Sequence, residues 1–271
     1  MDVHKDNNYI QLCGKLAIAK TILNAERESK LYVDSDGGDF SDVAGLKKAW
    51  FFEFFRNLSD GVRKPEIGRI FEKVSFIVFN YDRCIEHFMH ESLQRYFGVE
   101  AAEATAVMET LRIFHPYGTI GDLPWENELE GVPFGYKANR AAMQLMASRI
   151  RTYTEQVEDN GVLEEIHKQI QTADTLVFLG FSFHPQNVKL INPNRECATS
   201  QIFGTSVGIS DSNRDFILDD IRKLIGKSLR QNRMRDGIHP FVWEPIYISN
   251  LECARLIQEF SRSLFVAGVS H

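Results

Sequence analysis

The sequence has little proline, 8 residues in 271, and no apolar stretch reaches the roughly 18 consecutive residues that a membrane-spanning helix needs. Basic residues are not in excess either, because 31 Lys and Arg stand against 37 Asp and Glu, a net charge of −6 at pH 7. The N-terminal segment lacks the plan of a secretory signal, since charged and polar residues precede a periodic apolar stretch. These absences argue against a membrane protein, an exported protein and a broad nucleic-acid-binding surface, and we expect a cytoplasmic protein.

Cysteine is scarce and scattered. The four copies are Cys13, Cys84, Cys197 and Cys253, and no two form a Cys-x-x-Cys pair. This argues against a zinc ribbon or a four-cysteine zinc site, and we expect reduced, mostly buried thiols. Residues 86–91 carry two His and two Glu, but their spacing matches neither His-Glu-x-x-His nor its inverse. The acidic turn 34–39 lacks the glutamate of an EF-hand loop, so we predict no metal site.

What the sequence does contain is an alternation of two kinds of apolar segment. Segments rich in β-branched and aromatic residues predict strands at 74–80, 111–115, 175–180, 200–209 and 241–248. Apolar residues at three-to-four spacing predict helices at 9–30, 44–58, 82–97, 138–157, 160–172, 212–226 and 250–267. Pro245 restricts the last strand to a sheet edge.

Strands that alternate with helices indicate βα units. We therefore predict an α/β fold with a doubly wound, mostly parallel, Rossmann-like sheet that carries helices on both faces. The composition, 44% hydrophobic and 25% charged, is that of a globular protein. We expect a single domain over residues 1–271, with the helical segments 1–70 and 138–172 packed around the sheet. Ligands of such sheets bind beyond the carboxyl ends of the strands, so the residues that follow each strand are the candidates.

Polar residues follow the first two predicted strands. Asn80 ends the first strand and Asp82 comes two residues later, where it is also suited to cap the next helix. His115 and Tyr117 follow the second strand and are two residues apart, so on an extended chain they face the same side. Gly118 then allows a close backbone approach. Each residue also has an ordinary structural explanation, which for Asn80 is a turn.

Small and polar residues follow the third and fourth strands in the same way. Gly180 allows a ligand to approach, Ser182 supplies a hydroxyl, and His184 precedes a helix that we expect to begin near Pro185. The fourth strand contains or ends in Gly-Thr-Ser at 204–206. Each motif is weak by itself. Together the strand ends predict a polar pocket for a nucleotide-type ligand.

These clusters, in this order, resemble the sirtuin-like NAD-binding family over about residues 10–225. The segment 80–82, Asn-Tyr-Asp, is similar to the family's Gln-Asn-x-Asp segment. The segment 115–118 is similar to its His-Gly pair, and 180–182 stands where the family has Gly-Thr-Ser. The Phe-Asn-Tyr-Asp-Arg form resembles divergent bacterial members, some of which hydrolyse NAD in antiphage defence, more than it resembles the deacetylases. The absence of Cys-x-x-Cys pairs sets the chain apart from the zinc-bearing protein deacetylases of the family.

The resemblance implies a division of roles for hydrolysis of the nicotinamide–ribose bond of NAD. Asn80 orients the ribose and the attacking water, His115 is the general base, and Tyr117 is a hydrogen-bond donor. The implied cofactor contacts are Asn80, Asp82, Gly118, Gly180, Ser182 and His184. The partner is NAD or an ADP-ribose-like nucleotide, and the sequence leaves a homo-oligomer open.

Two departures from the family pattern define the alternative. Nothing in residues 1–15 matches the Gly-Ala-Gly-x-Ser loop that holds the NAD phosphates, so we expect either a chain shortened at its N-terminus or a lost phosphate loop. Tyr117 stands where the family has its catalytic histidine. The alternative is therefore a catalytically degenerate module that binds a nucleotide, ADP-ribose or a partner protein.

Overall fold

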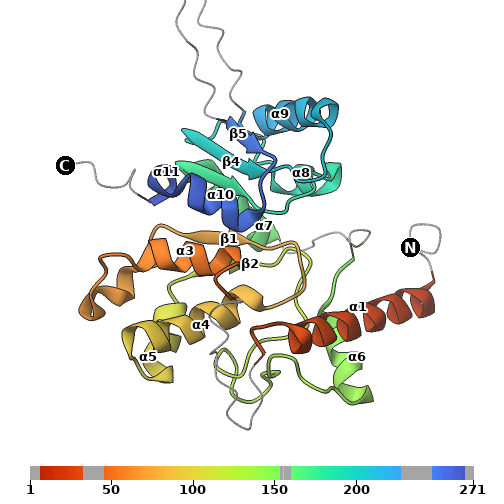
Figure 1. Cartoon of the computed structure of the whole chain (residues 1–271). Helices are drawn as coiled ribbons and strands as arrows, with labels where there is room; N and C mark the ends of the chain where they lie inside the picture. The colour runs from red at the N-terminus through yellow and green to blue at the C-terminus, as the bar shows by residue number, and fades with distance from the viewer. Residues whose placement is uncertain (1–6, 33–45, 153–154, 156–159, 227–245, 266–271) are drawn as a thin grey trace, which may run out of the picture. The chain divides into compact units, whose positions relative to one another are not determined.

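The computed structural model describes residues 7–32, 46–152, 155, 160–226 and 246–265. Its contacts divide the chain into two compact units, an N-terminal unit (Met1–Glu158) and a C-terminal unit (Asp159–His271). Figure 1 shows the elements of both units, and each unit is described by itself. The acidic turn predicted at 34–39 lies outside the described residues.

The N-terminal unit contains a two-stranded parallel sheet surrounded by helices (Figure 1). Strands β1 (Ser75–Ile77) and β2 (Arg112–Phe114) pair in the register Phe76 with Ile113. The helices are α1 (Asn8–Glu28), α3 (Trp50–Ser59), the 3-10 helix η2 (Lys64–Arg69), α4 (Cys84–Phe97), α5 (Ala101–Met108) and α6 (Arg140–Arg149).

The aromatic face of α3 packs into the core of this unit. The ring of Phe51 lies 4.5 Å from that of Phe88 on α4, and Trp50 and Phe54 lie 6.1 and 5.4 Å from Phe76 on β1. Each fully buried aromatic ring contributes about 1.5–3 kcal/mol through the removal of apolar surface from water. Phe55 of α3 is buried in the core, and Trp50, Phe51 and Phe54 are partly buried against it, so these rings pack α3 against α4 and the sheet.

A buried ion pair joins α1 to the start of α4. Arg83 Nη2 lies 2.6 Å from Glu26 Oε2, and the two side chains are only 2% and 0% exposed. Arg83 also donates to the carbonyl oxygens of Val132 and Pro133, and the Gly135 N–H donates to Glu26. The pair thus holds the long segment that follows β2 against both helices.

The C-terminal unit contains a three-stranded parallel sheet in the order β3-β4-β5 (Figure 1). Its strands are β3 (Thr175–Phe178), β4 (Gln201–Thr205) and β5 (Ile246–Ser249). Its helices are α7 (Asn160–Thr172), α8 (Pro185–Ile191), α9 (Asp211–Ile225), α10 (Cys253–Glu259) and α11 (Ser261–Phe265). The strand after Pro245 is at an edge, as its sequence predicts, although 241–245 lie outside the described residues.

The structure confirms a mixed α/β fold with short parallel sheets. Most predicted elements are present, but the strands are shorter than expected, and α5 has no counterpart in the prediction. The closing helix, predicted as one segment over 250–267, is divided at Phe260, whose ring packs 4.9 Å from that of Phe203. None of the helices in the described ranges is long and apolar enough to cross a membrane.

Candidate functional site

The carboxyl ends of β1 and β2 lie side by side, and this brings two of the predicted site residues together. Beyond β1, the Val78 N–H donates to the Phe114 carbonyl at 2.8 Å, which continues the pairing. His115 Nδ1 then lies 3.2 Å from the backbone carbonyl oxygen of Asn80. The Asn80 residue itself is exposed at this edge.

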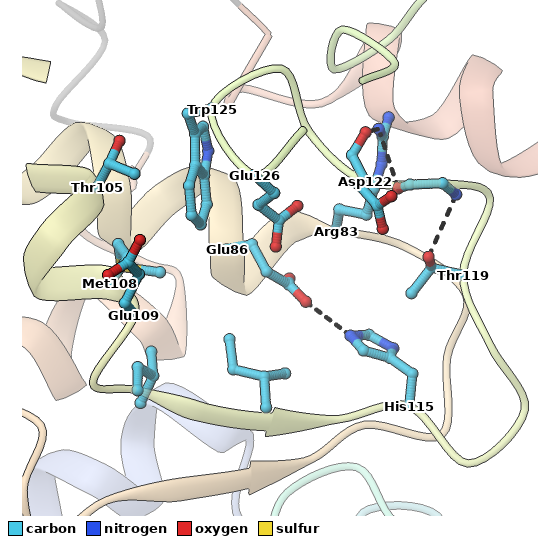
Figure 2. A pocket seen from close by; sticks show the side chains of 13 residues that line it. Arg83, Glu86, Thr105, Met108, Glu109, His115, Thr119, Asp122, Trp125 and Glu126 are labelled. Atoms are coloured by element: carbon cyan, nitrogen blue, oxygen red, sulfur yellow. Dashed lines mark hydrogen bonds and ion pairs between the residues drawn. The ribbon is translucent and has the colours of Figure 1, made fainter. Parts of the chain in front are cut away.

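His115 forms its second contact with Glu86, in the first turn of α4. The distance from His115 Nε2 to Glu86 Oε1 is 2.6 Å, and the two side chains are 11% and 7% exposed. Figure 2 shows the Glu86 carboxyl and the imidazole facing each other across the pocket. Since a carbonyl oxygen and a carboxylate both accept hydrogen bonds, His115 satisfies both partners only as the doubly protonated imidazolium.

The electrostatic surroundings agree with that state. Burial disfavours the charged imidazolium, but the hydrogen bond and charge of Glu86, the Asn80 carbonyl and the charge of Asp82 outweigh it, so the pKa of His115 is raised. His115 therefore differs from the free general base that the sequence analysis expects. It is one half of an imidazole–carboxylate pair, and any proton that it accepts is shared with Glu86.

The sequence analysis missed Glu86 as a site residue and considered it only within the metal candidate 86–91. The sequence does contain a signal for Glu86. The helix after the first strand starts at the sheet edge, so an acidic residue in its first turn lies near that edge. The neighbouring histidines have other contacts: His87 Nε2 lies 2.9 Å from the Leu31 carbonyl oxygen and His90 Nε2 lies 3.2 Å from Thr105 Oγ1. Within the described ranges, no three His, Cys, Asp or Glu side chains are grouped to hold a metal ion.

A pocket of about 360 Å³ lies between α4, α5, β2 and the segment after β2. Figure 2 shows the side chains that line it. Its charged lining consists of Arg83, Glu86, Glu109, His115, Asp122 and Glu126. Its apolar lining comes from Met108, Leu111, Ile113 and Trp125. The pocket is therefore amphipathic, with more carboxylates than cationic groups.

Two buried polar atoms in this pocket lack a hydrogen-bond partner among the described residues. They are Glu86 Oε2 and the indole nitrogen of Trp125. The Trp125 ring stacks on His90, with centroids 4.6 Å apart. Glu126 accepts the Leu123 N–H at 2.6 Å, and its pKa is raised, by desolvation first and by the charges of Glu86 and Asp122 after it. Buried polar groups are nearly always paired, so the two unpaired atoms mark a place where a ligand or water supplies partners.

Tyr117 and Gly118 are held by the protein's own packing. Tyr117 is 8% exposed, its ring lies edge-on to Phe79 at 5.9 Å, and burial raises its pKa. Gly118 has φ of 78°, and a Cβ there would overlap the carbonyl oxygen of Arg149 at the end of α6. Glycine is therefore required at 118 by a close approach of backbone to backbone, and its contact with a cofactor stays a prediction.

Asp82 supports the start of α4. Its Oδ1 accepts the Cys84 N–H at 3.2 Å, while Arg83 occupies the N-cap position. The helix therefore begins with an aspartate turn one residue before the cap. Asp82 is therefore not the N-cap that the sequence analysis offers as its structural role, although it accepts a bond from the first turn.

The other predicted contacts belong to the C-terminal unit. The Gly180 N–H donates to Thr205 Oγ1 at 2.9 Å, and Gly180 has φ of 59°. Ser182 and His184 are exposed, and α8 begins at Pro185 as predicted. Within this unit, the bond to Thr205 joins Gly180 to the end of β4.

The four cysteines are less buried than the sequence analysis expects. Cys197 is buried, Cys84 and Cys253 are partly buried, and Cys13 is exposed on α1. Burial, followed by the charge of Asp82 and its hydrogen bond, raises the pKa of the Cys84 thiol. Neither cysteine of the N-terminal unit lines the pocket.

The chain was compared with family models, with curated proteins and with solved structures. None of the three comparisons found a match. Functional interpretation therefore rests on the geometry of the site and on the residue resemblance.

Proposed function

We propose that this chain is a sirtuin-like, NAD-binding protein that hydrolyses the nicotinamide–ribose bond of NAD. The observation that carries the proposal is the contact of His115 with the Asn80 backbone at the ends of β1 and β2. The resemblance assigns these two segments to one NAD site, and they are neighbours in this fold. The proposal includes a doubly wound, Rossmann-like sheet, with which the two short parallel sheets are compatible.

The proposed reaction converts NAD and water to ADP-ribose, nicotinamide and a proton. The C1′–N bond breaks, nicotinamide leaves with the bonding electrons, and the water oxygen bonds to C1′. The exposed Asn80 amide orients the ribose hydroxyls and the water. The released proton passes to the His115–Glu86 pair, which accepts it only when the imidazole is neutral. Since the pKa of His115 is raised, we expect turnover to increase as pH rises through that pKa.

The resemblance also assigns Gly180, Ser182 and His184 of the C-terminal unit to ribose or phosphate contacts. Within that unit, Ser182 and His184 are exposed, and His184 stands directly before the first turn of α8.

The test is nicotinamide release, measured by chromatography after incubation of the full chain with NAD. We expect release by the wild type and its loss in Asn80→Ala, while Asn213→Ala, a change on the exposed side of α9, behaves as the wild type. The proposal of hydrolysis is wrong if the wild type releases no nicotinamide between pH 6 and 9.

A second candidate is nucleotide binding without turnover. It is favoured by Tyr117, which stands in place of the family histidine and is buried against Phe79, and by the two acceptors that occupy the His115 ring nitrogens. Calorimetry with NAD and with ADP-ribose separates the cases. Binding without release supports this candidate, and no binding of either nucleotide excludes both.

A further inference from the structure

The pocket beside the strand ends has features that the NAD reaction does not use. Glu86 Oε1 is occupied by His115, whereas Glu86 Oε2 has no partner in the described residues although the side chain is only 7% exposed. In Figure 2 the Glu86 carboxyl points toward His115, and Glu126 lies beside Glu86 in the pocket lining. A buried carboxylate oxygen without a donor is unfavourable, so a ligand N–H that donates to it removes this cost.

The charge of the lining indicates what kind of ligand this is. Four carboxylate residues line the pocket, against the two cationic groups Arg83 and His115. Arg83 is directed away from Glu86, because it pairs with Glu26 and donates to backbone carbonyl oxygens. Asp122 is also engaged, at 3.2 Å from Arg149. Glu86 is balanced by His115, so Glu109 and Glu126 leave a negative surplus, which attracts cations.

The size and apolar lining restrict the ligand further. A volume of about 360 Å³ is far larger than a metal ion, and the carboxylates and histidines within the described ranges do not form a metal cluster. Met108, Leu111 and Ile113 provide a surface for methylene groups. Trp125 adds an aromatic ring, the side chain that best stabilises a nearby organic cation.

We propose that this pocket binds a small organic cation that carries N–H donors, an alkylguanidinium or alkylammonium group. The head group donates to Glu86 Oε2 and to the Glu126 carboxylate, and its alkyl chain lies along Met108 and Ile113. This inference is independent of the proposed NAD reaction, because the cation site is tested without any nucleotide.

The experiment is calorimetric titration of the full chain with propylguanidinium and with butylammonium. Tetramethylammonium, which has charge but no N–H, and butyramide, which is neutral, are the comparison ligands. We expect saturable binding of at least one of the first two and none of the comparison ligands. Equal binding of tetramethylammonium, or no saturable binding of either N–H cation, overturns the proposal.

Two variants connect binding to the named carboxylates. Glu126→Gln and Glu86→Gln should each weaken binding about tenfold or more, since hydrogen bonds to charged groups are the strong ones. Glu128→Gln is the matched control, an exposed glutamate in the same segment that does not line the pocket. Because Glu86 also contacts His115, Glu126→Gln decides the result if Glu86→Gln lowers the melting temperature. Unchanged affinity in a folded Glu126→Gln variant contradicts the assignment.

The same head group occurs in free amines and in the side chains of a partner protein. Agmatine and the blocked peptide acetyl-Gly-Arg-Gly-amide carry the same guanidinium, so their affinities distinguish the two sources. Tighter binding of agmatine identifies a free small molecule, and tighter binding of the peptide identifies an arginine of a protein. If neither agmatine nor the peptide binds, the cation site is excluded, as it is when the N–H cations fail to bind in the first titration. Neither result affects the nicotinamide-release test of the proposed NAD reaction.

Discussion

Removal of the Arg83 side chain should strongly destabilise the N-terminal unit. Arg83→Met leaves the Glu26 carboxylate fully buried, with the Gly135 N–H as its remaining donor among the described residues. Loss of one partner of a buried ion pair costs about 3–5 kcal/mol, because the remaining charge is uncompensated. The carbonyl oxygens of Val132 and Pro133 lose a donor at the same time. We therefore expect a loss of about 3–5 kcal/mol in the free energy of unfolding.

The double variant Glu26→Leu/Arg83→Met separates the charge penalty from the loss of hydrogen bonds. It removes both charges, so the electrostatic penalty disappears, and the remaining cost comes from the backbone groups that lose partners, the Val132 and Pro133 carbonyls and the Gly135 N–H. The double variant should thus be more stable than Arg83→Met alone. Arg149→Met is the control, because Arg149 pairs with partly exposed Asp122 and should cost under about 1 kcal/mol.

The assay is urea unfolding followed by tryptophan fluorescence. Trp50 and Trp125 lie in the N-terminal unit, so a Trp243→Phe background restricts the signal to that unit. The reasoning is refuted if Arg83→Met costs under about 1 kcal/mol. It is also refuted if the double variant is less stable than Arg83→Met.

Three further predictions follow from individual residues. Folding raises the pKa of His115, so protonated His115 stabilises the folded protein fully below the ordinary histidine pKa of about 6.5, and this contribution is lost as pH rises through the raised pKa. His115→Gln should therefore reduce the pH dependence of the free energy of unfolding in urea. Gly118→Ala should lower the free energy of unfolding, measured in urea, by at least about 2 kcal/mol. Gly61 has a similar φ but open space around it, so Gly61→Ala should lower the free energy of unfolding by only about 1 kcal/mol. A thiol reagent should label exposed Cys13 in the folded protein, and buried Cys197 only after unfolding; rapid labelling of a Cys13→Ser variant at Cys197 contradicts this.

Sequence patterns predicted the elements whose apolar residues are periodic or continuous. Helices α1 and α9 agree with the pattern because their buried residues recur at the helical period, and β4 agrees because its apolar run is buried continuously. Helix α5 was missed, since its alanine-rich sequence has no distinct apolar stripe. The predicted strand 74–80 is reduced to Ser75–Ile77, because only this part pairs with β2 in a regular ladder.

In the candidate site, too, the sequence predicted some features and could not predict others. The order of polar residues after the strands predicted the proximity of Asn80 and His115, because adjacent parallel strands end at one edge. The partner of His115 could not be found this way, since Glu86 reaches it from a helix 29 positions away in sequence. The sequence pattern also did not predict the burial of Tyr117. By its position after β2 this residue resembles a site residue, and only its packing against Phe79 shows that it is part of the interior.

The central claim is that the strand ends around Asn80 and His115 form the NAD site. Its most direct test is the proton NMR signal of the His115 imidazole, assigned by its absence in His115→Gln and followed during titration of the full chain with NAD. The account predicts a saturable shift of this signal, together with a pKa for His115 above its ordinary value in the free protein. An unchanged His115 signal at NAD concentrations that saturate any other resonance would contradict it.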